Sequence, residues 1–380
     1  MLRAAEIGAG AGRAAPYAVE EVRGRAAFAA LRGEWDALAA RGPTDLPFVG
    51  HDWLSAWLDA FARGRAPLVL VARRPDGAAV GFAPFLPERR RGILRLLAPA
   101  NDHSCRFEWV LGPDASGAAA SIWAHLRDRC AWDAIVLRDV PRDGPTSTLL
   151  EPLARADGHL TGRWESLRTP RIALGGPAGT AEARTSAKFR ANLRRRAKRL
   201  AELGAVALER VDGRAGEAEV DAAVDAFLRL EASGWKGDRG SAIALDPALA
   251  GFYRRIARDA ARRGALAVRA LLLDGRPIAV HLGMIHRGVY LLPKTAYDES
   301  LGSVSPGQLL QREVLAECEA RGLSGFDFLG PDMPWKRDWA GDTAPHDWLY
   351  VYRPSLAGRA MHTLRHRVRP AAKEVLRWWR

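Results

Sequence analysis

The sequence predicts an α/β (α+β) fold of two domains, each with a mixed, mostly antiparallel sheet flanked by helices. The chain has 380 residues, of which 48% are hydrophobic and 27% charged, which is typical of a globular protein long enough for two domains. In both halves, short apolar runs are followed by segments of helical periodicity and a further strand-like run. A glycine-rich breaker, Gly175-Gly176-Pro177-Ala178-Gly179, separates the halves.

Two helices open the first half, because apolar residues recur there at helical spacing. Their inner faces carry Phe28, Leu31, Trp35 and Leu38 in one helix and Trp53, Trp57 and Phe61 in the other. The expected strands lie at 68–72, 80–86, 93–97, 107–111 and 134–137, the further helices at 121–130 and 147–156, and a final pair of elements near 162–174. The turn Pro75-Asp76-Gly77 indicates a hairpin between the first two strands.

The second half starts with a basic helix over 186–203, and three consecutive strands form its centre. We expect strands at 205–209, 266–273, 277–285, 289–294, 325–329 and 348–352, and helices at 222–231, 247–263 and 306–321. Asp274-Gly275 is a strong hairpin signal between the first two central strands, and Arg287-Gly288 marks the next turn. The predicted domains are 1–175 and 180–355, followed by a basic amphipathic helix over 356–380.

The start of the helix at Pro306 is the most informative local signal. Ser305 suits the N-cap, Pro306 suits the first helical position, and Gln308 would complete a capping box. A small, flexible loop precedes them, with Ser303 and Val304. A strand, such a loop and a helix start together form an anion site, because backbone N–H groups and the helix dipole point at one place. The alternative interpretation is an ordinary, well-capped helix.

The segments 291–299 and 303–310 resemble the CelD/BcsL acetyltransferases, which belong to the GNAT fold family and are linked to cellulose and exopolysaccharide biosynthesis. Four further segments support the resemblance, at 188–204, 230–242, 326–330 and 334–336. This family is similar to the FemAB peptidyltransferases, which have tandem GNAT-like domains. The resemblance implies that residues 303–308, including Gly307, cradle the pyrophosphate of acetyl-CoA or another acyl-CoA. The strict GNAT phosphate motif is absent, and Ser-Pro-Gly replaces it.

Acyl transfer to an amine needs a base for the amine and an acid for the leaving thiolate. The candidate bases are Glu231, His281, Asp298 and Asp327. The resemblance places the strand of His281 beside the acyl site, where this residue would be a base or a substrate contact; the alternative is a buried, hydrogen-bonded histidine. Tyr297 would protonate the thiolate, as a tyrosine does in many GNAT enzymes, or would simply pack.

Aromatic and lysine side chains are the candidate substrate contacts. Only six of the 57 basic residues are lysines, and three of the six fall in segments that we consider for the site. The proposed contacts are Trp235, Lys236, Lys294, Trp335 and Lys336. Trp235 and Lys236 follow a helix end at Gly234; the alternative is an ordinary C-cap, but the glycine-rich run over 237–241 favours a mobile functional loop. Asp327 lies in an apolar strand and must be paired or functional, with Lys336 or Lys294 as the expected partner.

The helix over 188–199 carries seven cations, which suggests an anionic partner: CoA phosphates, acidic polysaccharide, a membrane surface or tRNA. The alternative is a solvated face in an arginine-rich chain. The segment from His362 onward carries Leu364, Val368, Val375, Leu376 and Trp379 on one side, and it either docks on the domain or lies at a membrane interface. The net charge of +13 does not by itself indicate DNA binding, because no helix-turn-helix pattern or aromatic RNA platform accompanies it.

The sequence thus predicts an acyl-CoA-dependent acyltransferase that acts on an amine or hydroxyl of a sugar, polysaccharide precursor or amino compound. The alternatives are aminoacyl-tRNA-dependent peptidyl transfer and a non-catalytic scaffold for polysaccharide assembly. We expect no metal, because Cys105, Cys130 and Cys318 form no ligand pattern. No secretory signal and no long apolar run are seen, so we expect a cytoplasmic protein, with peripheral contact to the inner membrane as a further option.

Overall fold

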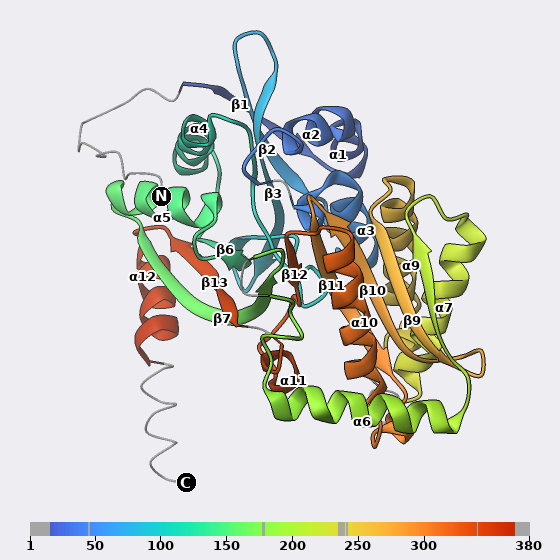
Figure 1. Ribbon diagram of the computed structural model, residues 1–380. Coiled ribbons are helices and arrows are strands. Elements are labelled where there is room, and N and C mark those ends of the chain that lie inside the picture. The colour runs from blue at the N-terminus through green and yellow to red at the C-terminus, as the bar shows by residue number, and fades with distance from the viewer. Residues whose placement is uncertain are drawn as a thin grey trace.

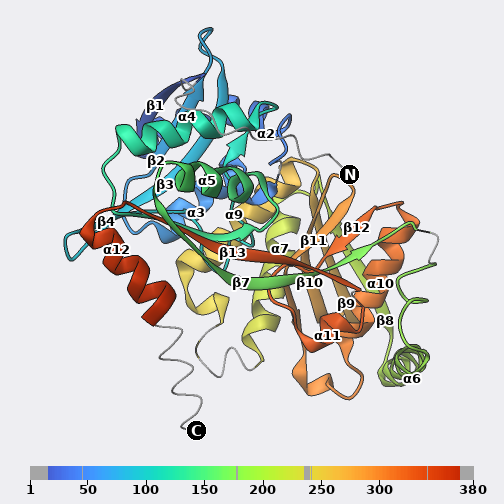
Figure 2. The same cartoon turned by 90° about the vertical axis from the view of Figure 1, so that its left-hand side faces the viewer.

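The computed structural model describes residues 16–44, 46–176, 179–234, 240, 242–339 and 341–368. Within this part of the chain, thirteen strands form one sheet, and helices cover both of its faces (Figures 1 and 2). The strands are β1 Ala18–Arg23, β2 Leu68–Arg73, β3 Ala79–Arg90, β4 Ile93–Leu97, β5 Val110–Leu111, β6 Ala134–Pro141, β7 Leu160–Ala173, β8 Val206–Asp212, β9 Leu266–Leu273, β10 Arg276–His286, β11 Val289–Tyr297, β12 Gly325–Asp327 and β13 Asp342–Tyr352. No described helix is both long and apolar enough to span a bilayer.

The helices pack on the sheet in three groups. The α-helices are α1 Arg25–Ala30, α2 Arg32–Ala39, α3 His51–Phe61, α4 Ala115–Asp128, α5 Pro145–Ala156, α6 Ala187–Leu203, α7 Glu217–Ala232, α9 Pro247–Arg262, α10 Pro306–Ala320, α11 Pro334–Arg337 and α12 Leu356–Thr363. Helices α1, α2, α3, α7 and α9 share one apolar core that crosses both halves. Helices α4 and α5 bury a second core in the first half, and α6 and α10 a third in the second half.

The two halves repeat one topology. The strand order is β1-β2-β3-β4-β6-β13-β7-β12-β11-β10-β9-β8, with β5 paired to β3. In the first half the antiparallel strands β2, β3 and β4 are followed by α4 and by β6, which is parallel to β4. In the second half β9, β10 and β11 are followed by α10 and by β12, which is parallel to β11. The α/β fold predicted from the sequence is therefore confirmed.

Strands from the two halves interleave at the centre of the sheet. Strand β13 comes late in the chain, yet it lies between β6 and β7 and is antiparallel to both. Strand β7 pairs with β13 over most of its length and with β12 at its end. A local pattern carries no information about such distant pairings. The division into domains at 1–175 and 180–355 stays a prediction.

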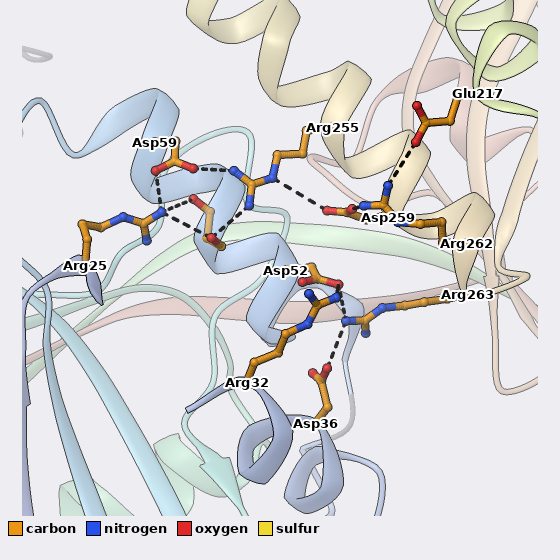
Figure 3. A network of polar contacts seen from close by, with 11 residues as sticks. Arg25, Arg32, Asp36, Asp52, Asp59, Glu217, Arg255, Asp259, Arg262 and Arg263 are labelled. Atoms are coloured by element: carbon orange, nitrogen blue, oxygen red, sulfur yellow. Dashed lines mark hydrogen bonds and ion pairs between the residues drawn. The ribbon is translucent and has the colours of Figure 1, made fainter. Parts of the chain in front are cut away.

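Ion pairs join the first half to α9 (Figure 3). Arg263 reaches Asp52 at 2.6 Å and Asp36 at 3.3 Å, and Arg255 pairs with Asp59 of α3. These pairs tie α9 and the residue after it to α2 and α3, although each partly exposed pair contributes little alone. Phe252 of α9 also packs edge-on against Trp53, with ring centroids 5.5 Å apart.

Most predicted elements are confirmed, although α4, α7 and β13 begin five or six residues before their predicted starts, and four other predicted elements differ more. The expected helix over 28–38 breaks at Leu31 into α1 and α2. The pair near 162–174 is one 14-residue strand, β7, and only Val110–Leu111 of the strand expected at 107–111 forms. Strand β1 was not predicted, because an edge strand rich in charge lacks an apolar run. The predicted terminal helix is described as α12 and a π-helical turn, Leu364–Val368, and its remainder, residues 369–380, lies outside the described residues.

Candidate functional site

A cavity of about 520 Å³ opens in the second half, where α6, α7, β10, β11, α10 and α11 meet. Its walls mix apolar groups, carboxylates and a single arginine. The lining residues are Arg196, Leu230, Glu231, Gly234, His281, Thr295, Ala296, Tyr297, Glu299, Gly302, Ser305, Gly307, Gln308, Pro334, Trp335 and Asp338. Pockets of this size hold small molecules and cofactors.

Strand β11 offers a free edge beside the cavity. It pairs with β10 along its length, but with β12 only from Val289 to Leu291. The strands separate after that point, because β12 ends at Asp327 and the chain turns at Leu329, whose φ is 47°. The register of β11 against β10 also shifts between Leu291 and Lys294, which is a bulge. Among the described residues no strand pairs with this edge of β11 after Leu291, and Thr295, Ala296 and Tyr297 of the unpaired stretch line the cavity.

The start of α10 presents a backbone donor to the same cavity. Gln308 and Leu309 donate their N–H groups to the carbonyl of Ser305, and no described residue accepts the N–H of Gly307. The expected capping box is wrong. Ser305 is left-handed, with φ 49°, and its hydroxyl donates to the Gly302 carbonyl at 3.2 Å instead of capping the helix. The helix dipole and one free donor thus face the cavity.

Gln308 organises the wall instead of capping α10. Its side-chain amide donates to the carbonyl of Trp335 at 3.2 Å and accepts from the indole N–H of Trp339 at 2.5 Å. Trp339 packs edge-on against Phe189 of α6, with ring centroids 5.2 Å apart. These contacts lock α6, α10 and α11 into one rigid wall. The remaining residues of the predicted phosphate loop are less involved, since Val304 and Pro306 are buried and Ser303 is exposed away from the lining.

His281 is the buried polar group of the cavity. Its side chain is 1% exposed, and its Nδ1 has no hydrogen-bond partner among the described residues. Burial lowers the pKa of His281 to about 3, so the ring is neutral at physiological pH. Thr295 lies opposite in the register of β10 and β11. A neutral imidazole with a free nitrogen is a hydrogen-bond partner for a ligand and a weak base.

Glu231 and Tyr297 line the cavity with His281. Glu231 ends α7 with 5% exposure, and its Oε2 accepts the N–H of Ile243 at 2.9 Å, so the carboxylate is held in place. Tyr297 ends β11, is 45% exposed, and lies beside the helix start: a Cβ built on Gly307 would be 3.5 Å from its ring. The structure therefore brings three of the five predicted acid–base groups to one cavity.

Asp298 and Asp327 lie outside the lining. The Asp298 carboxylate accepts a hydrogen bond from Arg276 at 3.0 Å and two more from the N–H and the hydroxyl of Ser300. These contacts stabilise the short turn that follows β11. Asp327 is paired with Arg106 of the first half and accepts the N–H of Leu329 at 2.9 Å. The expected lysine partner of Asp327 is therefore wrong, because a guanidinium from a distant segment occupies that position.

The substrate contacts predicted on lysine and aromatic side chains have three outcomes: one lines the cavity, two lie outside its lining, and two lie outside the described residues. Trp335 lines the cavity. Lys336 is buried and donates to the carbonyls of Leu329 at 2.6 Å and Pro331 at 2.9 Å, and burial lowers its pKa to about 8. Lys294 lies 5.8 Å above the ring of Tyr253 and is not part of the lining. Trp235 and Lys236 lie outside the described residues.

Several cavity residues were not singled out from the sequence. Arg196 was noted only as part of the basic helix, yet it alone of the α6 cations reaches the lining. Asp338 and Glu299 add carboxylates; burial raises the pKa of Asp338, and the Arg196 guanidinium opposes that shift. Thr295 faces His281 across two strands, and strand register was the one signal that would have found it. Trp335 and Asp338 are three residues apart, which places them on one side of a helical turn; this spacing was a weaker indication that both belong to the site.

Metal-ligand side chains gather elsewhere, in the first half. Glu21, His125 and Cys130 place their donor atoms within 4.8 Å of one another. Glu21 accepts from His125 at 3.0 Å and from the Cys130 thiol at 3.4 Å, and Arg23 pairs with its other oxygen. These contacts account for the cluster as a hydrogen-bonded group, and none of its members lines the cavity.

Comparisons with solved structures bear on the fold. The C-terminal domain of a putative lysylphosphatidylglycerol synthetase from Agrobacterium fabrum is 13% identical, with 89% of this chain and 97% of that one covered at a TM-score of 0.50. FemX is 14% identical, with 88% and 98% covered at a TM-score of 0.57. A conserved protein of unknown function from Bacteroides thetaiotaomicron is 12% identical, with 85% and 97% covered at a TM-score of 0.55. These likenesses show a shared fold.

No curated protein sequence matches the chain. Residues 187–337 match the acetyltransferase (GNAT) domain family, and this segment contains every residue that lines the cavity except Asp338. The match covers α6 through α11, with the free edge of β11 and the start of α10. The chain is an acyltransferase enzyme, and residues 187–337 in its second half are similar to GNAT acetyltransferase domains.

Proposed function

We propose that this enzyme transfers an acyl group from acyl-CoA to an amine of a sugar, polysaccharide precursor or amino compound, as the CelD/BcsL resemblance implies. The observation that carries the proposal is the free edge of β11 next to the unbonded N–H of Gly307, in one cavity. Amide groups of a pantetheine arm would pair with the edge like an added strand. Its pyrophosphate would rest on the start of α10, with Arg196 as countercharge.

The remaining residues of the cavity supply proton transfer. The acceptor nitrogen attacks the thioester carbonyl, the new C–N bond forms, and the C–S bond breaks. Glu231 takes the proton from the amine, and Tyr297 gives its proton to the departing sulfur. His281 is too poor a base for this step because it is buried, so we assign to it a hydrogen bond to the acyl group or acceptor. Three carboxylates in the lining, Glu231, Glu299 and Asp338, favour a cationic amine over a hydroxyl acceptor.

Titration calorimetry of the full chain with acetyl-CoA, longer acyl-CoAs and free CoA tests the donor. We expect binding of free CoA and of at least one acyl-CoA, with a 1:1 stoichiometry. If none of these ligands binds, the proposal fails. Chain-length preference is read from the same series, because the acyl group would extend toward Leu230 and His281 in the lining.

A second candidate is aminoacyl transfer from charged tRNA, and the surface of α6 favours it. Among the described residues, none forms an ion pair with the exposed cations of this helix, which are Lys188, Arg194, Arg195, Lys198 and Arg199. Such a surface suits a polyanion larger than CoA. Transfer activity in a cell extract that is abolished by RNase, together with no binding of CoA, would favour this candidate over the first.

A further inference from the structure

Helix α12 and the π-helical turn Leu364–Val368 pack on the sheet mainly through polar and aromatic side chains. His366 accepts or donates a hydrogen bond at 3.1 Å with the Tyr352 hydroxyl, and its ring lies edge-on to Tyr350 at 5.3 Å. Arg365 donates to the Tyr350 hydroxyl at 2.8 Å and lies over the Trp164 ring. A Cβ on Gly162 would be 2.3 Å from His366, so this glycine makes the close approach possible. The interface is thus built mostly from histidine, arginine and aromatic edges, with Met361 as its aliphatic contact.

The apolar side of α12 and of the turn that follows it faces away from the protein. Leu356 is 89% exposed, Leu364 53% and Val368 49%, and Ala360 between them is also exposed. These four residues recur at i, i+4, i+8 and i+12, so they form one continuous stripe. A surface helix of a globular protein normally has the opposite orientation, with its leucines against the core. No described residue therefore covers this apolar stripe.

Positive charge borders the stripe. Arg359 and Arg367 are exposed on its flank, and neither forms an ion pair with another described residue. From residue 356 to the end, the chain has seven basic residues and one acidic residue, Glu374. The basic residues are Arg359, Arg365, Arg367, Arg369, Lys373, Arg377 and Arg380. The same stretch contains Trp378 and Trp379, and tryptophan favours the membrane interface.

We propose that α12 is a membrane-binding helix, whose leucine–valine stripe enters the headgroup region of an anionic bilayer while its arginines contact lipid phosphates. An apolar stripe with arginines beside it matches the chemistry of that surface. Three large apolar side chains are too few for a stable protein–protein interface, which buries about 800 Å² on each partner. The inference does not depend on the donor or acceptor of the enzyme.

Co-sedimentation of the full chain with lipid vesicles tests the proposal. We expect binding to vesicles of equimolar phosphatidylglycerol and phosphatidylcholine, and at least about tenfold weaker binding to phosphatidylcholine alone. Leu356→Glu and Leu364→Glu should each weaken binding to the anionic vesicles by about tenfold or more. Both positions are exposed, so thermal unfolding of the variants should match the wild type.

Leu245→Glu is the matched control, because Leu245 is 61% exposed on a different part of the surface. It should bind vesicles as the wild type does. Equal binding of all three variants, or no binding of the wild type to anionic vesicles, would overturn the proposal. So would a dimer in solution that Leu364→Glu dissociates, since a second copy would then cover the stripe. If vesicles bind only after residues 369–380 are removed, the chain terminus itself covers the stripe. That result would also overturn the proposal.

Discussion

The guanidinium of Arg106 pairs with the carboxylate of Asp327, and each side chain is only 6% exposed. The two residues come from different halves of the chain, 221 positions apart. Arg106 also donates through Nε to Nε2 of His346 at 3.0 Å. Asp327 ends β12 at the point where that strand leaves β11. The pair therefore joins the two halves of the chain at the point where β12 leaves the edge of β11 that we assign to the donor.

Replacing Asp327 with Ala should destabilise the fold by about 3–5 kcal/mol, because it leaves the Arg106 charge buried without a partner. Urea unfolding measures this loss. An Arg106→Met and Asp327→Leu double variant should recover most of it, since it removes both charges. An Asp327→Ala protein of wild-type stability whose turnover is nonetheless strongly reduced would show instead that Asp327 is a catalytic residue.

His281 should make the stability of the protein fall in mild acid. Its pKa is lowered from 6.5 to about 3 in the folded protein, so the unfolded chain binds the extra proton below pH 6.5. The free energy of unfolding should then decrease by up to about 1.4 kcal/mol for each pH unit as pH falls through this window. His346, whose pKa burial lowers to about 4, adds to the same loss.

A His281→Leu variant isolates the contribution of His281. Chemical denaturation of both proteins from pH 6.5 to about 4 should give a shallower pH dependence for the variant, while His346 contributes equally to both. Identical slopes would mean that His281 is already protonated, or bound to a partner, in the folded protein.

Arg196 should contribute to the binding of the donor's phosphates and not to the binding of its pantetheine arm. Arg196→Glu is expected to weaken CoA binding by about tenfold or more, since it replaces a charge-assisted hydrogen bond with repulsion. Binding of pantetheine, which has no phosphate, should change little. Lys188→Glu is the control on the same helix, because Lys188 is exposed and outside the lining. An equal effect of the two variants on CoA would indicate only general charge attraction.

Replacing Tyr297 or Glu231 should lower the turnover rate much more than the affinity for CoA. Tyr297→Phe and Glu231→Gln keep the shape of each side chain, and each should lower kcat by about 10²-fold or more with little change in the Kd for CoA. The pH–rate profile should lose its alkaline limb in Tyr297→Phe if this hydroxyl is the acid. Unchanged kcat in both variants would move the acid–base groups elsewhere in the cavity.

Periodicity and turn residues predicted most of the elements, because they are local properties of the chain. Trp53, Trp57 and Phe61 placed α3, and Asp274-Gly275 placed the hairpin of β9 and β10. Long-range pairing was not predictable in this way. Nothing in the sequence around β13 indicates that it lies between β6 and β7, and nothing near Asp327 points to Arg106.

The candidate site was predicted in part. Glu231, His281 and Tyr297 were predicted as site residues, and all three line the cavity. The strand–loop–helix order around Ser305 was the local signal that pointed to this part of the chain. The capping box was misread because Ser305 is left-handed, a conformation that sequence seldom reveals for a non-glycine residue. Arg196 could not be told apart from the similar cations around it, because the packing of α6, including Phe189 on Trp339, sets which of them faces the cavity.

The central claim is that donor phosphates rest at Gly307, and calorimetry of CoA with two variants tests it most directly. Gly307→Ala should bind CoA as the wild type does, because the added Cβ would meet the Tyr297 ring at 3.5 Å, an ordinary contact. Gly307→Glu should lose at least about tenfold in affinity, about 1.4 kcal/mol, because it places a carboxylate at the phosphate site. Undiminished affinity of Gly307→Glu, in a folded protein, would contradict the placement of the donor at this helix.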